Sequence, residues 1–94
     1  MEYELNYNQA VFTTKSVMSN QVDIVRVYHE NDGDWQFLGD DILDNENACI
    51  LSLGEILEFD NTLAEIVKSM PCGKLAIRET KKDSWHVIED VCNK

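Results

Sequence analysis

Two neighbouring β-rich runs constrain the fold of this chain more than any other feature of its sequence. Residues 21–30 and 35–38 are rich in Val, Ile and aromatic side chains, and Asp32-Gly33 lies between them. An Asp-Gly pair suits a type I′ hairpin turn, in which both central residues adopt positive φ. We therefore predict a hairpin here, so that at least part of the sheet is antiparallel.

Other segments also have the composition of strands. Residues 11–14 are rich in β-forming side chains, and residues 48–51 form a short apolar run that is typical of a buried strand. Residues 15–20 predict a turn or a single helical turn. Residues 3–7 alternate between apolar and polar side chains, which predicts either an edge strand or a frayed terminus within residues 1–9.

Residues 74–80 and 84–89 predict a second hairpin around a polar turn at residues 81–83. Within it, we expect one pair of side chains to pack against the other across the ladder. The pairs are Leu75 and Ile77 on one strand, and Trp85 and Val87 on the other.

Two helices are predicted between the hairpins, at about residues 53–59 and 62–70, because apolar side chains recur there at helical spacing. Each begins with a capping-box pattern, formed by Ser52 with Glu55 and by Thr62 with Glu65. Adjacent hairpins with clustered helices favour an α+β fold with a mainly antiparallel sheet of about five to six strands and the helices on one face. The 94 residues suit a single domain, 1–94. The second face of this sheet is expected to stay partly open, where a second copy or another partner can bind.

The charge of the chain is strongly negative and unevenly spread. The net charge is −10, and residues 27–67 contain eleven acidic residues but no Lys or Arg. Sequence-independent binding to nucleic acid or to an anionic membrane needs basic side chains, so both are disfavoured. The complementary inference is a basic protein partner. The alternative is that the charge only keeps a small protein soluble.

No motif predicts a catalytic, cofactor or metal site. Gly33 comes too early in the acidic segment for an EF-hand calcium loop. Cys49 lies in an apolar run and is predicted to be a core residue, whereas Cys72 follows Pro71 and is predicted to be exposed. A Cys72–His86 nucleophile pair is conceivable, because such partners need to meet only in space.

The aromatic residues Trp35, Phe37 and Trp85 allow two interpretations. Large aromatic side chains in the strands of a small domain favour core positions. The alternative is a binding hot spot on an exposed sheet face, rimmed by acidic residues.

The sequence also bears on the location of the protein. The first residues are acidic and lack the basic and then apolar pattern of a signal peptide, and no window is apolar enough for a membrane helix. Three cysteines without framework spacing favour a reducing compartment. These features predict a cytoplasmic protein.

The chain resembles a family of small bacterial domains of unknown function, some of which are described as immunity-protein-like, after the immunity proteins of polymorphic toxin systems. The similarity covers about residues 10–88. It lies in Tyr28-His29-Glu30-Asn31-Asp32-Gly33-Asp34-Trp35-Gln36-Phe37, in Leu53-Gly54-Glu55-Ile56-Leu57-Glu58-Phe59-Asp60, and in Leu63, Glu65-Ile66, Pro71, Gly73, Ala76-Ile77-Arg78-Glu79 and Trp85. Met70 and Asn61 stand where family members often carry Leu and Pro.

The resemblance implies that the chain neutralises a toxin by covering its active site or substrate groove. Together with the charge, it leads to the hypothesis of a non-catalytic, acidic binding domain that acts on a basic toxin partner. The candidate partner-binding residues are Glu30, Asp32, Asp34, Asp40, Asp41 and Asp44. A self-associating structural or regulatory domain is the alternative hypothesis, and a metal- or thiol-dependent enzyme is a third.

Overall fold

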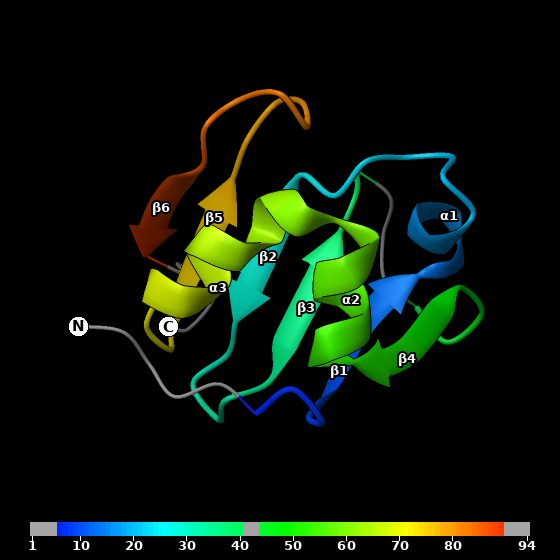
Figure 1. The fold of residues 1–94 in the computed structure, drawn as a ribbon, viewed down its shortest axis with the longest axis horizontal. Coiled ribbons are helices and arrows are strands. Elements are labelled where there is room, and N and C mark those ends of the chain that lie inside the picture. The colour runs from blue at the N-terminus through cyan, green and yellow to red at the C-terminus, as the bar shows by residue number, and fades with distance from the viewer. Residues whose placement is uncertain (1–5, 41–43, 90–94) are drawn as a thin grey trace.

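The computed structural model describes residues 6–40 and 44–89, which form one six-stranded sheet with short helices (Figure 1). The α+β fold predicted from the sequence is confirmed. The elements, in chain order, are β1 (Ala10–Thr14), α1 (Lys15–Met18), β2 (Arg26–His29), β3 (Trp35–Leu38), β4 (Ala48–Ser52), α2 (Leu53–Phe59), the 3₁₀ helix η1 (Asn61–Leu63), α3 (Ala64–Ser69), β5 (Lys74–Ile77) and β6 (His86–Glu89).

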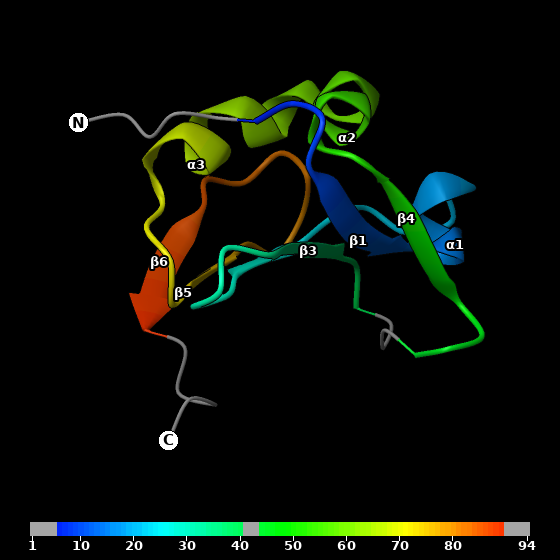
Figure 2. The same cartoon turned by 90° about the horizontal axis from the view of Figure 1, so that it is seen from below.

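The strands lie in the order β4-β1-β3-β2-β5-β6. Neighbouring strands are antiparallel except β1 and β3, which are parallel. Helices α2 and α3 cover one side of the sheet, while α1 lies beside its β1–β4 end (Figure 2). The predicted packing of both main helices on one face is therefore confirmed.

The predicted β2–β3 hairpin is confirmed, but its predicted type I′ turn is wrong. His29 pairs with Trp35, which leaves a longer connection than the two residues of a type I′ hairpin. The Gly33 N–H donates to the Glu30 carbonyl at 2.9 Å, and the Glu30 N–H donates to the Asp34 carbonyl at 2.8 Å. Gly33 has a φ of 96°, and Asp32 does not adopt positive φ. Gly33 is therefore the residue of this turn that adopts the left-handed conformation, as in hairpins with three-residue loops.

The β5–β6 hairpin is also confirmed, with shorter strands than predicted and a different side-chain pairing. Leu75 pairs with Ile88 and Ile77 pairs with His86, whereas Val87 lies opposite Ala76. Trp85 precedes β6 and takes no part in this ladder. The predicted packing of Leu75 and Ile77 against Trp85 and Val87 is wrong because the register places these two sets on opposite faces of the sheet.

The strand predicted at residues 48–51 exists as β4, but it is an edge strand and not a buried one. Ile50 is 65% exposed, and Cys49 is partly exposed instead of lying in the core. A short apolar run has the same composition in both settings, so the sequence pattern could not distinguish them.

The first capping box is confirmed, and the second is wrong. Ser52 and Glu55 make both reciprocal hydrogen bonds, at 3.1 and 2.9 Å. Thr62 lies inside η1, whose N-cap is Asp60, and α3 follows it without a side-chain cap. An acidic cap two residues earlier thus starts this helical segment in place of Thr62.

Two other local predictions concern the N-terminal part of the chain. The helical turn predicted within residues 15–20 is confirmed as α1, where the Thr14 hydroxyl accepts the N–H of Val17. Of the segment predicted as a strand or frayed terminus, residues 1–5 lie outside the described residues. Tyr7 lies in a turn and is 52% exposed, so the strand is not present in the described part of this segment.

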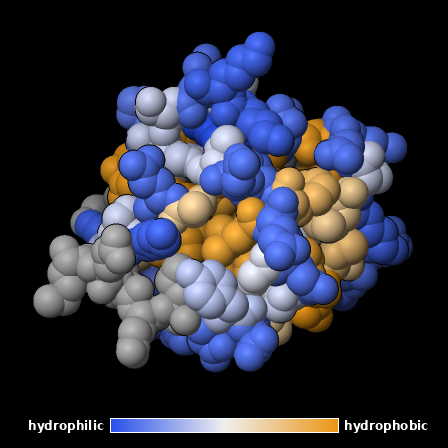
Figure 3. Space-filling model, viewed as in Figure 1, coloured by the Kyte–Doolittle hydropathy of each residue, from blue (hydrophilic) through white to orange (hydrophobic). Residues whose placement is uncertain are grey.

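The core lies between the sheet and helices α2 and α3. Trp35 and Phe37 are 3% and 0% exposed, which confirms their predicted core positions. Trp85 is only partly buried and packs against the border of the core. The outer surface on the helix side carries many hydrophilic side chains around a smaller hydrophobic area (Figure 3). The hydrophilic surface of the chain therefore extends over the helices.

Candidate functional site

The side of the sheet opposite α2 and α3 carries a row of mostly apolar side chains that crosses all six strands. The register aligns one residue from each strand, because every pairing joins side chains on the same face. We call this side the open face. Its row, in sheet order, is Ile50, Phe12, Gln36, Tyr28, Leu75 and Ile88.

The ends of this row are strongly exposed. Ile50 is 65% exposed at one end and Ile88 is 44% exposed at the other, while Phe12, Tyr28 and Leu75 are half-buried between them. Ile77, on the same face one row away, is 36% exposed. Exposed apolar side chains at both edges of this face, with half-buried ones between them, make it the candidate interaction surface.

Polar groups lie within and beside this row. Gln36, its one polar member, donates from Nε2 to Oε2 of Glu30 at 3.2 Å. Arg26 lies on the same face as Tyr28 and donates from Nε to the Gly39 carbonyl at 2.9 Å. This face therefore combines apolar side chains with hydrogen-bonded polar ones, as protein interfaces do.

The candidate acidic residues do not form one cluster. Glu30, Asp32 and Asp34 lie in the loop before β3, whereas Asp40 and Asp44 follow its other end. A strand rises about 3.3 Å per residue, so β3 keeps the two groups apart. Asp41 lies outside the described residues. The acids therefore lie on both sides of the position where the row crosses β3.

Two of these acids shape their own loops. Asp32 Oδ1 accepts the N–H of Asp34 at 3.1 Å, and Asp44 Oδ1 accepts the N–H groups of Glu46 and Asn47 at 3.0 and 2.9 Å. Short acidic side chains often stabilise turns in this way. Asp34 and Asp40 are exposed, and their carboxylates are the best placed of the set to meet a partner.

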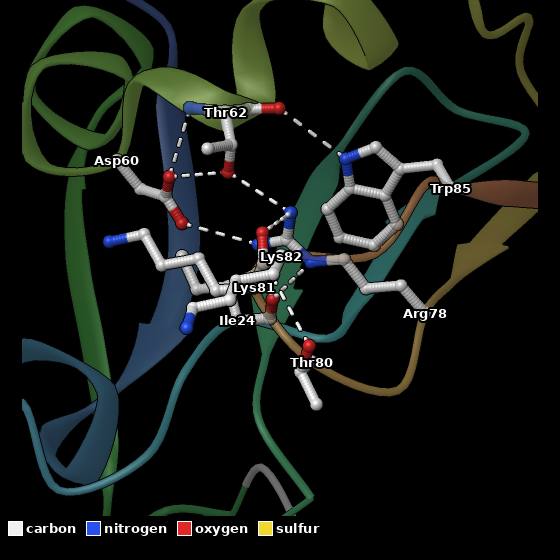
Figure 4. Close-up of polar contacts among 8 residues, drawn as sticks. All are labelled: Ile24, Asp60, Thr62, Arg78, Thr80, Lys81, Lys82 and Trp85. Carbon is white, nitrogen blue, oxygen red and sulfur yellow. Dashed lines mark hydrogen bonds and ion pairs between the residues drawn. The ribbon is translucent and has the colours of Figure 1, made fainter.

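Arg78 forms a buried polar network that the sequence analysis missed (Figure 4). Its Nε and Nη2 donate to the Ile24 carbonyl at 3.0 and 2.8 Å, and Nη2 forms an ion pair with Asp60 at 3.4 Å. Nη1 donates to the Thr62 hydroxyl at 3.1 Å, and the guanidinium stacks 4.1 Å from the ring centre of Trp85. Desolvation by burial lowers the pKa of Arg78, and the nearby carboxylates oppose that shift.

This network is structural and does not form a ligand site. All three guanidinium nitrogens of Arg78 already donate to the protein, and the Asp60 carboxylate also caps η1. A groove beside it is lined by side chains of both charge signs, including Glu65, Lys82 and Asp83. A mixed lining of this kind does not select an anion or a cation.

The Cys72–His86 pair considered from the sequence is wrong. His86 begins β6 opposite Ile77, at the far end of β5 from Cys72. Cys72 instead contacts His29, with Sγ 3.5 Å from Nε2. No local sequence pattern predicts this contact, because it depends on the pairing of β2 with β5.

Other classes of site have less support in the described part of the chain. No group of three His, Cys, Asp or Glu side chains among residues 6–40 and 44–89 is arranged to hold a metal ion. In the same residues, no helix has the length and apolar character needed to span a membrane.

Comparison with known proteins adds no family to these observations. No family model, no curated protein and no solved structure matches the chain. The open face is therefore the candidate site on its own geometry.

Proposed function

We propose that this chain is a non-catalytic protein-binding domain that uses its open face to bind a partner with a basic surface. The observation that carries the proposal is the row across the sheet, apolar on every strand except at Gln36 of β3, with Ile50 and Ile88 exposed at its ends. Burying this row against a partner would remove apolar surface from water, which is the main favourable term in protein association.

The charge of the chain supports a basic partner over a second copy. Each copy carries a net charge of −10, so two copies repel each other as they approach. The exposed carboxylates of Asp34 and Asp40 lie on both sides of the row on β3. Lys and Arg side chains around an apolar centre on the partner would complement this arrangement and speed association.

An immunity protein is the specific form of this function that we propose. The resemblance of residues 10–88 to immunity-protein-like domains supports it, and an acidic cover suits a toxin whose active site binds an anionic substrate. In this proposal the protein acts in the cytoplasm, binds its toxin there and blocks access to the substrate.

The test is a matched pair of substitutions in neighbouring residues of β6. Ile88 lies on the open face and Val87 lies on the opposite one, and they are 44% and 46% exposed. Tagged wild-type chain, Ile88→Asn and Val87→Asn would be used to capture proteins from the source lysate, followed by affinity measurement with the captured partner. We expect a stoichiometric basic partner, at least about tenfold weaker binding by Ile88→Asn, and unchanged binding by Val87→Asn.

The charge part of the proposal has its own variant. The double substitution Asp34→Asn with Asp40→Asn should weaken binding at about 0.05 M salt and have little effect at about 0.5 M salt, because salt screens exposed charges. Equal losses in Ile88→Asn and Val87→Asn would contradict the open face as the binding surface. A salt-insensitive homodimer that Ile88→Asn dissociates would instead support the self-associating domain.

A further inference from the structure

Cys72 and His29 form a side-chain pair that the proposed binding function does not use. Cys72 lies in the exposed turn between α3 and β5, and its Sγ is 3.5 Å from Nε2 of His29. His29 is the last residue of β2 and is 8% exposed. A nucleophilic atom at the surface is thus in contact with a buried imidazole that can serve as a base.

The surroundings of His29 determine which ring nitrogen faces the thiol with a lone pair. Nδ1 lies 2.9 Å from the Met70 carbonyl, which can only accept a hydrogen bond, so Nδ1 carries the proton. In the neutral ring Nε2 is then an acceptor, and it points at Cys72. The ring also stacks on Trp35, with 3.7 Å between centroids and an interplanar angle of 11°. His29 is therefore held in one orientation and one tautomer.

The backbone of the turn is fixed against the same strand. The Gly73 N–H donates to the His29 carbonyl at 2.6 Å, and Gly73 has a φ of 83°. A Cβ at this position would lie 2.6 Å from Oδ1 of Asn31, so the turn packs closely on the β2–β3 loop. The distance from Cys72 to His29 is thus set by the backbone as well as by side-chain packing.

We infer that Cys72 is a reactive thiol, with His29 as its general base, and that it is a site of thiol–disulfide exchange with small disulfides such as glutathione disulfide. The Cys72 sulfur attacks one sulfur of the disulfide as Nε2 of His29 takes the thiol proton. A mixed disulfide forms on Cys72, and the disulfide's own S–S bond breaks. The departing thiolate takes the proton from His29 and leaves as the free thiol, so the number of disulfide bonds is unchanged.

The chain contains an internal comparison for this reactivity. Cys49 lies in edge strand β4 and is partly exposed, while both described histidines lie in other strands, His29 in β2 and His86 in β6. Exposure alone would let Cys49 react to some extent, whereas of these two described cysteines only Cys72 has a histidine in contact with it. His86 provides the matched control for the base, because it is exposed and lies away from Cys72.

The experiment measures the rate at which glutathione disulfide modifies Cys72 in the intact chain at neutral pH, with each cysteine followed by peptide mass spectrometry. The reference is an N-acetylated synthetic peptide with the sequence of residues 70–74, which has the same thiol and no histidine. We expect Cys72 to react at least about tenfold faster than the peptide and faster than Cys49. His29→Gln should reduce its rate to that of the peptide, and His86→Gln should leave it unchanged.

A rate for Cys72 equal to or below that of the peptide would overturn the inference. So would an unchanged rate in a His29→Gln variant whose circular dichroism matches the wild type. If His29→Gln does not fold, the comparison of the wild-type chain with the peptide decides alone. Partner binding is measured separately with Ile88→Asn, so a failure of either proposal leaves the other standing.

Discussion

Arg78 joins three parts of the chain that are far apart in sequence. Its guanidinium binds the carbonyl of Ile24 before β2, the carboxylate of Asp60 between α2 and η1, and the ring of Trp85 before β6. Arginine suits this position because its planar fork can donate in several directions at once. The buried charge is tolerated because it is paired and fully hydrogen-bonded.

We predict that Arg78→Lys lowers the free energy of unfolding by about 2 kcal/mol or more. A lysine keeps the charge, but its single nitrogen cannot replace the set of hydrogen bonds to Ile24, Asp60 and Thr62, each worth about 1 kcal/mol. Urea denaturation followed by circular dichroism measures the change. Lys82→Met, in the exposed loop nearby, is the control and should change stability by less than about 0.5 kcal/mol. Equal stability of Arg78→Lys and the wild type would contradict a structural role for the network.

Residue pairs were the hardest feature to predict from the sequence. The exposure of Cys72 follows from its place after Pro71, and the structure confirms it. The contact of Cys72 with His29 could not be predicted from the sequence, because the two residues are 43 positions apart. The pairing of β2 with β5 brings them together. Arg78 was missed for the same reason, since nothing near it in the sequence indicates burial. Contacts between distant segments depend on strand order, which local patterns do not encode.

Helix starts were predicted well only where the cap is local and complete. Ser52 and Glu55 form the expected box because Ser52 ends a strand with extended backbone, which leaves its hydroxyl free to cap α2. Thr62 has the same sequence pattern, but Asp60 already caps the backbone N–H of Thr62 and accepts its hydroxyl. The stronger acceptor, two residues earlier, therefore sets the start of the second helical segment.

We predict that Ser52→Ala costs about 1 kcal/mol of stability, because the first turn of α2 loses its cap. Glu65→Ala should cost less than about 0.5 kcal/mol, because Glu65 is exposed and α3 has no side-chain cap. Thermal or urea denaturation of both variants gives the comparison. Similar losses in the two would mean that the second capping box does form in solution.

The positions of the strands in the sequence were predicted more reliably than their places in the sheet and the faces of their side chains. All six strands of the described chain fall within or close to the predicted segments, because alternation and β-branched side chains are local signals. The edge position of β4 and the face of Val87 were not predicted. Both depend on neighbours across the sheet, and a shift of one residue in register exchanges the two faces of a strand.

The whole sheet has two different sides, and this asymmetry carries the proposed function. The helices bury one side, where Val11, Val27 and Phe37 are fully buried. On the other side the apolar row is exposed at both of its ends, at Ile50 and Ile88. The sequence predicts a partly open face, but its charge pattern points to the acids as the binding residues, because charge is visible in a sequence and strand register is not.

We predict that amide hydrogen exchange divides the sheet into a protected centre and two less protected edges. Strands β1, β3, β2 and β5 have neighbours on both sides, whereas β4 and β6 have one each. Amides of the central strands should exchange at least about tenfold more slowly than those of the edge strands, as measured by mass spectrometry of peptides. Strong protection of β6 in the isolated protein, lost in Ile88→Asn, would instead indicate self-association through the open face.

The position of β1 between β4 and β3 also determines when this strand can be paired during synthesis. Phe12 of β1 pairs with Gln36, and Ala10 of β1 pairs with Ser52, so both pairings join residues that are far apart in sequence. The two hairpins, in contrast, close over short loops. Such non-local pairings raise the contact order of the chain and slow its folding. Until β3 and β4 have emerged from the ribosome, the apolar side chains of β1 have no strand to pair with and are open to association with other nascent chains. Strand β1 therefore stays without one of its partners until β4 has emerged, and the yield of folded protein should depend on how quickly the chain supplies its two neighbours.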